Sequence, residues 1–146
     1  MSIIENLKIR EAEQKDINAI DLLTKELGYD LNPSEVKIKL KNFKRNPNEK
    51  IFVAELENVI GWMHASIVEP LESDRFVEIR GIIVNYNFRK KGIGCKLIKT
   101  AENWGKEVGC IKIRIRTNIT RNETRKYYKN LSFISKKIQE VLEKQI

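Results

Sequence analysis

The 146-residue sequence has few of the residues that build metal centres or disulfide frameworks. It contains two cysteines, Cys95 and Cys110, and a single histidine, with no CxxC pair and no Cys/His cluster. A structural zinc site needs about four such ligands, and small secreted domains depend on several paired cysteines. We therefore expect no bound metal and no disulfide framework. The cysteine content favours a cytoplasmic protein.

Long apolar runs are missing as well. No uninterrupted apolar stretch approaches the ~20 residues of a membrane-spanning helix. The first residues, MSIIENLKIREAE, lack the positive start and apolar core of a secretory signal. No membrane partner is expected. The sequence has no internal repeat, low-complexity run or linker, so we expect one domain over residues 1–146.

Acidic residues are scarce in the second part of the chain. Residues 1–88 hold 12 Lys and Arg against 15 Asp and Glu, a net charge of −3, whereas residues 89–146 hold 16 against 5, a net charge of +11. A basic half suits a polyanionic partner such as nucleic acid, a membrane surface or a phosphorylated small molecule. A general abundance of lysine explains it equally well. No recognised DNA- or RNA-binding signature is present, so a nucleic-acid partner is not expected.

Apolar periodicity predicts helices and strands in the order β-α-α-β-β-β-α-β-α-β, with an optional further strand. This order indicates a single α/β domain (α+β in some schemes) with a mixed sheet flanked by helices. Strand 76–84, helix 93–108 and strand 110–117 form a predicted βαβ unit with parallel strands. The tail, 133–146, fits both a strand and a helix pattern. The other predicted strands are 7–13, 50–56 and 59–68, and the other helices are 16–27, 33–45 and 121–130.

The turn between strand 76–84 and helix 93–108 combines positive charge with small residues. Arg89, Lys90 and Lys91 precede two glycines, Gly92 and Gly94, at the helix entrance. The first N–H groups of a helix have no internal partner, and glycine allows an anion to approach them closely. The turn therefore fits a phosphate, or else it is a tight connection with solvated lysines. The Walker A and dinucleotide-binding glycine patterns are both absent.

The R-x-x-G-x-G pattern of this turn, after a hydrophobic strand, resembles the acetyl-CoA loop of the GNAT superfamily of N-acetyltransferases. A second block, RNETRKYYKNLSF, is similar to the one that closes the domain of that family, with Tyr127-Tyr128 in place of Phe-Tyr. Ser132 stands where the family has glycine, so we expect a differently built turn there. Arg121 stands where many members have an asparagine that contacts pantetheine. The likeness covers residues 7–146 and is nearest to the bacterial branch of small domains that includes aminoglycoside-type acetyltransferases.

The resemblance implies transfer of an acetyl group from acetyl-CoA to a primary amine, by direct attack in a ternary complex. Tyr128 matches the tyrosine that acts as general acid in the family, although a half-buried packing tyrosine is the alternative. Acetyl-CoA is the implied cosubstrate, without a metal. The residues implied to bind it are Ile82, Ile83, Val84, Arg89, Lys90, Lys91, Gly92, Ile93 and Gly94.

Glu78 is the predicted base, acting directly or through a water chain. It lies eleven residues before Arg89, the place of the catalytic glutamate in one branch of the family. Strict alternation puts residues 76, 78, 80, 82 and 84 on one face, so Glu78 shares the more polar face with Arg80. An ion pair between the two is the structural alternative. His64 is either a second proton relay or a hydrogen-bonded structural histidine. Cys95, at the helix start, is either a nucleophile or a buried small residue.

The acceptor is a small-molecule or peptide amine that the sequence does not identify. In the resembling family, the segment between the first two helices walls the acceptor pocket, which here is LGYDLNPSE. Tyr29 and Asp30 in that segment are predicted to attract a cationic amine: an aminoglycoside, a polyamine or a lysine. A homodimer is compatible with the sequence. The alternative functions are an acetyl-CoA sensor without turnover and a basic nucleic-acid-binding module.

Overall fold

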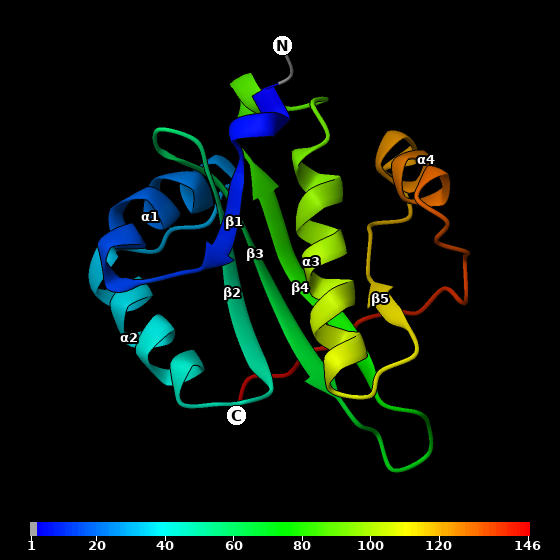
Figure 1. Ribbon diagram of the computed structural model, residues 1–146. Helices are drawn as coiled ribbons and strands as arrows, with labels where there is room; N and C mark the ends of the chain where they lie inside the picture. Colours follow the sequence, from blue (N-terminus) through cyan, green and yellow to red (C-terminus); the bar gives the residue numbers. More distant parts are fainter. Residues whose placement is uncertain (1–2) are drawn as a thin grey trace. The chain divides into compact units, whose positions relative to one another are not determined.

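The computed structural model describes residues 3–146 of the chain. They form two compact units, a first that ends at Ile115 and a second over Arg116–Ile146 (Figure 1). The first unit contains the whole sheet and three α-helices, and the second contains the remaining α-helix.

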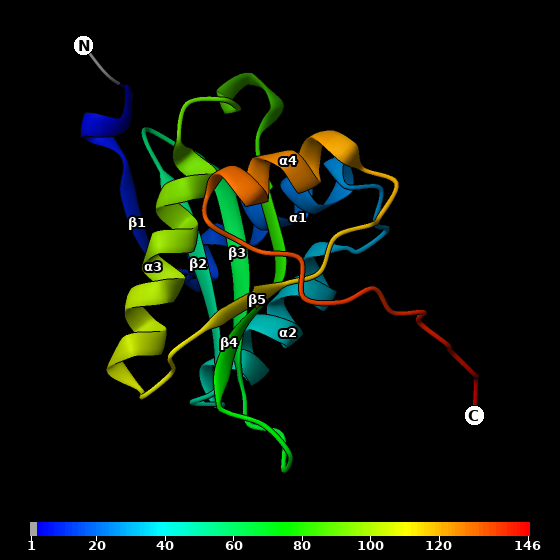
Figure 2. The same ribbon diagram turned by 90° about the vertical axis from the view of Figure 1, so that its right-hand side faces the viewer.

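The first unit is a five-stranded mixed sheet in the order β1-β2-β3-β4-β5. Its first three pairings are antiparallel and β4 pairs with β5 in parallel, so the predicted βαβ unit and α/β fold class are confirmed. Helices α1 and α2 cover one face of the sheet and α3 covers the other (Figures 1 and 2). The elements are β1 (Lys8–Glu11), α1 (Ile17–Glu26), α2 (Pro33–Lys44), β2 (Glu49–Glu55), β3 (Val59–Val68), β4 (Phe76–Val84), α3 (Ile93–Glu107) and β5 (Ile113–Ile115), with 3-10 turns at Ile3–Asn6, Gln14–Asp16 and Tyr86–Phe88.

The start of α2 follows the sequence signals closely. The Asn32 side chain accepts a hydrogen bond from the Glu35 amide at 3.0 Å, and Pro33 occupies the first helical position. The Asn32 side chain satisfies one of the backbone N–H groups that a helix start leaves unpaired, and proline has no such N–H group to satisfy. Val36 and Leu40 of this helix then pack against the sheet in one buried cluster with Val53. The cap therefore fixes where α2 begins.

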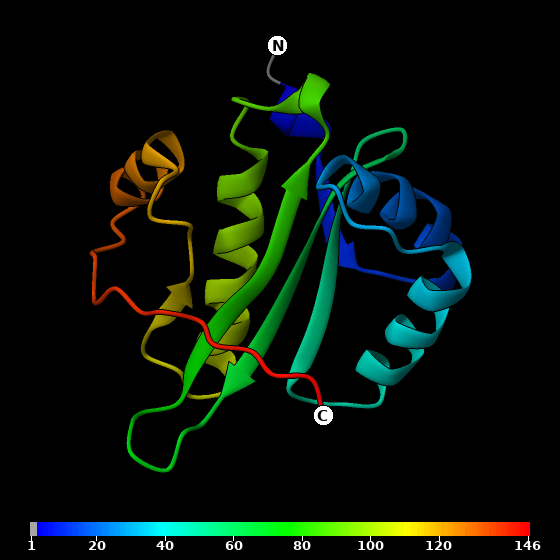
Figure 3. The same cartoon turned by 180° about the vertical axis from the view of Figure 1, so that it is seen from behind.

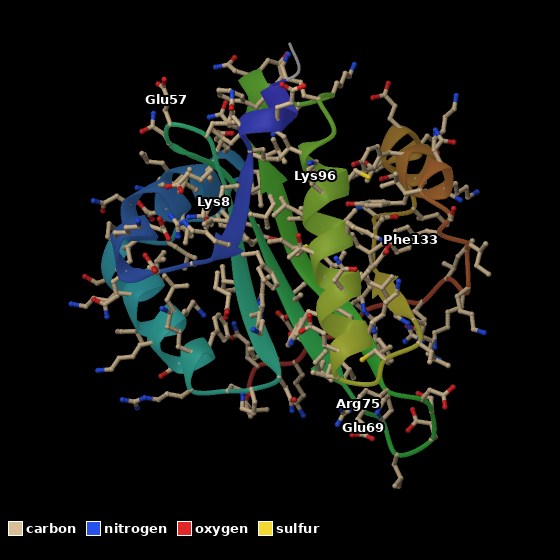
Figure 4. All side chains as sticks on the ribbon, viewed as in Figure 1. Lys8, Glu57, Glu69, Arg75, Lys96 and Phe133 are labelled. Atoms are coloured by element: carbon tan, nitrogen blue, oxygen red, sulfur yellow. The ribbon has the colours of Figure 1, made fainter. Side chains whose placement is uncertain are left out.

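Helix α3 lies unusually close to β4 at Gly105. A Cβ atom at this position would overlap the side chain of Val77. Trp104, the preceding residue, packs edge-on against Phe52 with ring centroids 6.4 Å apart. At the end of the helix, Arg75 donates to the Val108 carbonyl at 2.7 Å and pairs with Glu69 at 3.1 Å (Figure 4). These contacts hold α3, and hence its N-terminal turn, against the sheet.

Substituting alanine for Gly105 is expected to destabilise the protein. Overpacking a close contact costs about 1–3 kcal/mol, and the overlap with Val77 places this case at the upper end of that range. The gain in helix propensity, about 1 kcal/mol, offsets only part of it. Urea unfolding of Gly105→Ala should give a lower free energy of unfolding, whereas the control Asn103→Ala, exposed on the same helix, should not. Equal stability of the two variants would contradict the close packing.

The second unit contains one α-helix, α4 (Asn122–Asn130). Arg121 is its N-cap and makes no side-chain cap bond, so Thr120 and Glu123 do not form a capping box at this helix start. Thr120 Oγ1 instead donates to Asn118 Oδ1 at 2.8 Å.

The final strand of the predicted element order is also wrong. Within the described chain, no helix or strand follows Asn130. Ile134, Ile138 and Leu142 are exposed by 85%, 72% and 82%. An apolar strand is stable when it pairs with other strands and covers a core, and the second unit provides no strand for this tail to join.

Candidate active site

A β-bulge in β4 sets the geometry of the site. His64 of β3 lies opposite Gly81 while the next residue, Ala65, lies opposite Ile79, so Arg80 is an extra residue without a partner on β3. An extra residue shifts the two-residue alternation of side chains. Glu78 and Gly81 therefore face the α1–α2 side. The prediction that all even-numbered residues of this strand share a face is wrong.

Beyond the bulge, one edge of β4 is open. The parallel pairing with β5 covers only Val77–Ile79, so the following stretch, 81–84, is paired within the described chain with β3 alone (Figure 3). This stretch contains Ile82, Ile83 and Val84, the predicted backbone contacts of acetyl-CoA. Unpaired backbone groups at a strand edge are available to an extended ligand.

The basic turn after β4 has the backbone conformation that an anion site needs. Lys90 and Gly92 both adopt left-handed conformations, with φ of 62° and 83°, and α3 begins at Ile93. Alternation of left-handed residues turns successive N–H groups to one side, next to the positive end of the helix dipole. Arg89 is partly used within the turn, because its Nε donates to the Val84 carbonyl at 2.9 Å. The exposed side chains of Lys90 and Lys91 are the remaining formal charges.

A cavity of about 370 Å³ lies on the α1–α2 side of the sheet. Its wall includes Tyr29 from the connection between the two helices, as well as Arg80 and Gly81 from the bulge. Asp30 does not belong to the wall. The rest is formed mainly by apolar and aromatic side chains, among them Leu31, Leu40, Phe43, Ile51 and Trp62. A volume of this size is typical of small-molecule sites.

A chain of polar side chains crosses three strands beside this cavity. His64 Nε2 lies 2.7 Å from Glu49 Oε1, and the same oxygen accepts a hydrogen bond from Ser66 Oγ at 2.6 Å. Arg80 Nε donates to Ser66 Oγ at 3.3 Å, and Arg80 Nη1 pairs with Glu78 at 2.7 Å. Glu78 therefore forms the ion pair with Arg80 that the sequence analysis gave as the alternative to a catalytic role.

The two ends of this chain differ in their access to the cavity. Glu78 is 3% exposed and is not part of the wall. His64 is part of the wall, and its ring lies against Phe43 with centroids 4.5 Å apart. If the ring nitrogen Nε2 carries the proton toward Glu49, Nδ1 is left as an acceptor, which is the arrangement of a carboxylate-oriented general base.

Sequence reasoning missed Glu49, Ser66 and the shape of the cavity. Glu49 and Ser66 lie directly opposite each other in the β2–β3 pairing. The available signal was the spacing of His64 and Ser66, two residues apart and hence on one strand face. Cys95 is exposed in the first turn of α3, so the prediction of a buried small residue is wrong.

Tyr128 lies on α4 in the second unit. Its ring packs edge-on against Tyr127 and Phe133, with centroids 5.2 Å and 5.6 Å away. Burial, with a smaller contribution from Tyr127, raises the pKa of Tyr128 to about 12. Just after the helix, Ser132 has a φ of 73°, so serine adopts the left-handed conformation that favours glycine.

Two negative findings apply to the described residues. Over 3–146, no three or more His, Cys, Asp and Glu side chains come together to bind a metal ion. In the same part of the chain, no helix has the length and apolar character needed to cross a membrane.

The first unit thus combines a mixed sheet with an open β4 edge, a glycine-opened start of α3 and a cavity on the α1–α2 face. The Acetyltransferase (GNAT) family model matches residues 13–133, so the chain belongs to the GNAT acetyltransferase family. This confirms the family resemblance; the match does not distinguish a branch. No curated protein matches the chain significantly.

Solved structures of the same fold are numerous. The aminoglycoside N-acetyltransferase AAC(6')-Iy, in complex with a CoA bisubstrate analogue, is 22% identical with a TM-score of 0.84, covering 96% of this chain and 99% of its own. Glucosamine-6-phosphate N-acetyltransferase from Arabidopsis thaliana is 20% identical with a TM-score of 0.83, covering 94% and 97%. A transcriptional regulator from Bacillus halodurans C-125 is 23% identical with a TM-score of 0.78, covering 96% and 99%. At these identities the likeness establishes the fold.

Proposed function

We propose that the chain is a cytoplasmic N-acetyltransferase that moves an acetyl group from acetyl-CoA to a primary amine, and that residues 1–146 act as one domain. The observation that carries the proposal is the family match over 13–133, which extends across both compact units. The CoA analogue in a protein of the same fold supports acetyl-CoA as the cosubstrate.

In this proposal the diphosphate of acetyl-CoA binds at the basic turn. The amides of Gly92, Ile93 and Gly94 and the charges of Arg89, Lys90 and Lys91 bind its phosphate oxygens. The pantetheine arm pairs with the open edge of β4 at Ile82, Ile83 and Val84. The left-handed residues of the turn and the unpaired strand edge support this arrangement.

The reaction is a direct transfer. The amine lone pair attacks the thioester carbonyl carbon, a C–N bond forms, and the C–S bond breaks with its electron pair leaving on sulfur. The attacking nitrogen loses one proton to a base, and the CoA thiolate gains one from an acid. The backbone amide that pairs with the thioester carbonyl stabilises the negative charge on its oxygen.

Tyr128 is the proposed acid. With a pKa of about 12 it stays protonated at neutral pH. It is a weaker acid than a thiol of pKa about 8.5, so complete proton transfer to the thiolate costs roughly 5 kcal/mol. The hydroxyl therefore acts mainly as a hydrogen-bond donor to the thiolate. Where the proton passes on to sulfur, solvent water returns one to the tyrosinate.

Two side chains are candidates for the base. Glu78, the choice from sequence, would act through water, because its carboxylate is buried and paired with Arg80. His64 is favoured by its position in the cavity wall and by the carboxylate of Glu49 behind it. Both candidates belong to the same polar chain. A proton taken by His64 lies next to the carboxylate of Glu49, and one taken by Glu78 lies on a carboxylate.

Calorimetry with acetyl-CoA, followed by an assay of free-CoA release with a panel of amines, tests the proposed function. We expect heat on binding and CoA release that depends on the amine. Heat without release for any amine would indicate a sensor. No heat and no release would refute the proposal.

Charge reversal at Lys90 and Lys91 is expected to weaken acetyl-CoA binding by about 10- to 100-fold, since two charge-assisted phosphate contacts are replaced by repulsion. Arg89 is left unchanged because it supports the turn through Val84. The matched control is the double reversal of Lys37 and Lys41, exposed on α2 and outside the cavity wall. Calorimetry at two salt concentrations provides the measurement. Equal affinities of the two double variants would contradict the phosphate site.

A further inference from the structure

The cavity beside the bulge has a wall without carboxylates. Tyr29, Phe43 and Trp62 supply aromatic surface, and no Asp or Glu belongs to the wall formed by the described residues. The Trp62 ring lies close to the bulge: a Cβ on Gly81 would come within 3.1 Å of its Cη2 atom. A cavity of about 370 Å³ with these walls fits a compact apolar or aromatic body.

The formal charges of the wall are positive. Lys39 of α2 and Arg80 of the bulge both line the cavity. Lys39 makes no ion pair with any described residue, and the Arg80 side chain is 49% exposed despite its contact with Glu78. The nearby acids, Glu49 and Glu78, lie outside the wall and are engaged by His64, Ser66 and Arg80.

This arrangement differs from what a polycation needs. An aminoglycoside or polyamine carries several positive charges, which carboxylates on the wall would have to compensate. Here such a ligand meets two cations instead. A ligand carboxylate, in contrast, finds two donors that form charge-assisted hydrogen bonds. The indole Nε1 of Trp62 is in addition a buried donor without a partner among the described residues.

We propose that the acceptor is a compact apolar or aromatic amine that carries a carboxylate, and that Lys39 and Arg80 select it over polycationic amines. The inference rests on the proposed acetyl transfer and names the acceptor class of that same site. The positive wall also favours the neutral over the protonated form of the bound amine, which is the form that attacks the thioester.

A matched amine panel tests the inference. L-phenylalanine and L-phenylalaninamide share one body and differ in the carboxylate, while spermidine and kanamycin are polycations. By free-CoA release, we expect kcat/KM for phenylalanine to exceed that for phenylalaninamide by about tenfold and that for either polycation by about 100-fold, since a charged partner is gained in one case and repelled in the other.

Two substitutions in α2 test whether Lys39 causes the preference for the carboxylate. Lys39→Glu should lower the ratio of kcat/KM for phenylalanine to kcat/KM for phenylalaninamide about tenfold, because the reversed charge repels the carboxylate while its effect on the amine is common to both substrates. Lys37→Glu makes the same change of net charge on the same helix, outside the cavity wall, and should leave both amines within about twofold.

The outcomes separate the two proposals. Turnover of spermidine or kanamycin that equals or exceeds that of phenylalanine, or an unchanged preference in Lys39→Glu, overturns the acceptor class and leaves the acetyltransferase standing. Binding of acetyl-CoA without turnover of any of the four amines also overturns the acceptor class. No binding of acetyl-CoA and no turnover overturns the proposed function, and the inference with it.

Discussion

Tyr128→Phe should lower kcat by about 100-fold and leave the KM for acetyl-CoA within about threefold. The variant removes only the hydroxyl that donates to the leaving thiolate, and positioned acids of this kind contribute about 100- to 10,000-fold. The lower value is expected here, because a pKa of about 12 makes Tyr128 a weak acid that acts mainly as a hydrogen-bond donor. Steady-state CoA release with a saturating amine gives both constants.

Tyr127→Phe is the matched control, since it removes the same atom from the next residue of α4. Its kcat should stay within about threefold of the wild type. The pH profile adds a second check. With a pKa of about 12, Tyr128 keeps its proton up to about pH 11, so it contributes no basic limb below that pH. A basic limb near pH 9 that disappears in Tyr128→Phe would contradict this role, as would an unchanged kcat.

His64→Gln should lower kcat/KM by about 100-fold, the usual scale for loss of a general base. The glutamine amide can still donate to Glu49, so the polar chain keeps its hydrogen bond while the basic ring nitrogen is lost. Glu78→Gln should cost about tenfold or less, because Glu78 is buried behind Arg80 and outside the cavity wall.

Glu49→Gln separates orientation from proton transfer. It keeps a hydrogen-bonding side chain next to His64 but removes the carboxylate, and we expect a loss of about tenfold, between wild type and His64→Gln. Circular dichroism and urea unfolding of all three variants check that each is folded. A 100-fold loss in Glu78→Gln with full activity in His64→Gln would assign the base to Glu78, as the sequence predicts, and would remove His64 from the mechanism.

Most helices and strands of the first unit could be predicted because the sequence signals that place them are local. Apolar periodicity placed α1, α2 and α3, Asn32 and Pro33 marked the start of α2, and alternation placed β2 to β4. The glycine-opened turn before α3 was equally visible. Each of these features depends on residues within a few positions of one another, which is the range that propensity and capping control.

The bulge and the cavity were not predictable in the same way. The position of Arg80 depends on the register between β3 and β4, which involves residues far apart in sequence. Gly81 inside a strand was the one local hint, since glycine within a strand often marks a bulge. Once the alternation shifts there, the faces assigned to Ile82 and Val84 reverse, and the contents of the cavity wall change with them.

The polar chain beside the cavity could not be predicted from the sequence for a similar reason. Glu49, Ser66 and His64 come from two strands and meet only because the β2–β3 register aligns them. From sequence, Glu78 was the more prominent acid because a family motif marks its position. The prediction of a strand after Asn130 was wrong for another reason. The apolar spacing of the tail fits both a strand and a helix, and the second unit contains no strand that would favour the first.

The most direct test of the central claim is an amide-resolved NMR titration of the labelled protein with acetyl-CoA. We predict that the amide resonances of Gly92, Ile93 and Gly94 and of the open edge of β4, 82–84, shift together and saturate. Gly28 and Gly109, outside the proposed site, should keep their positions. Shifts confined to other parts of the chain, or none at a millimolar ligand concentration, would contradict the claim that the start of α3 binds coenzyme A.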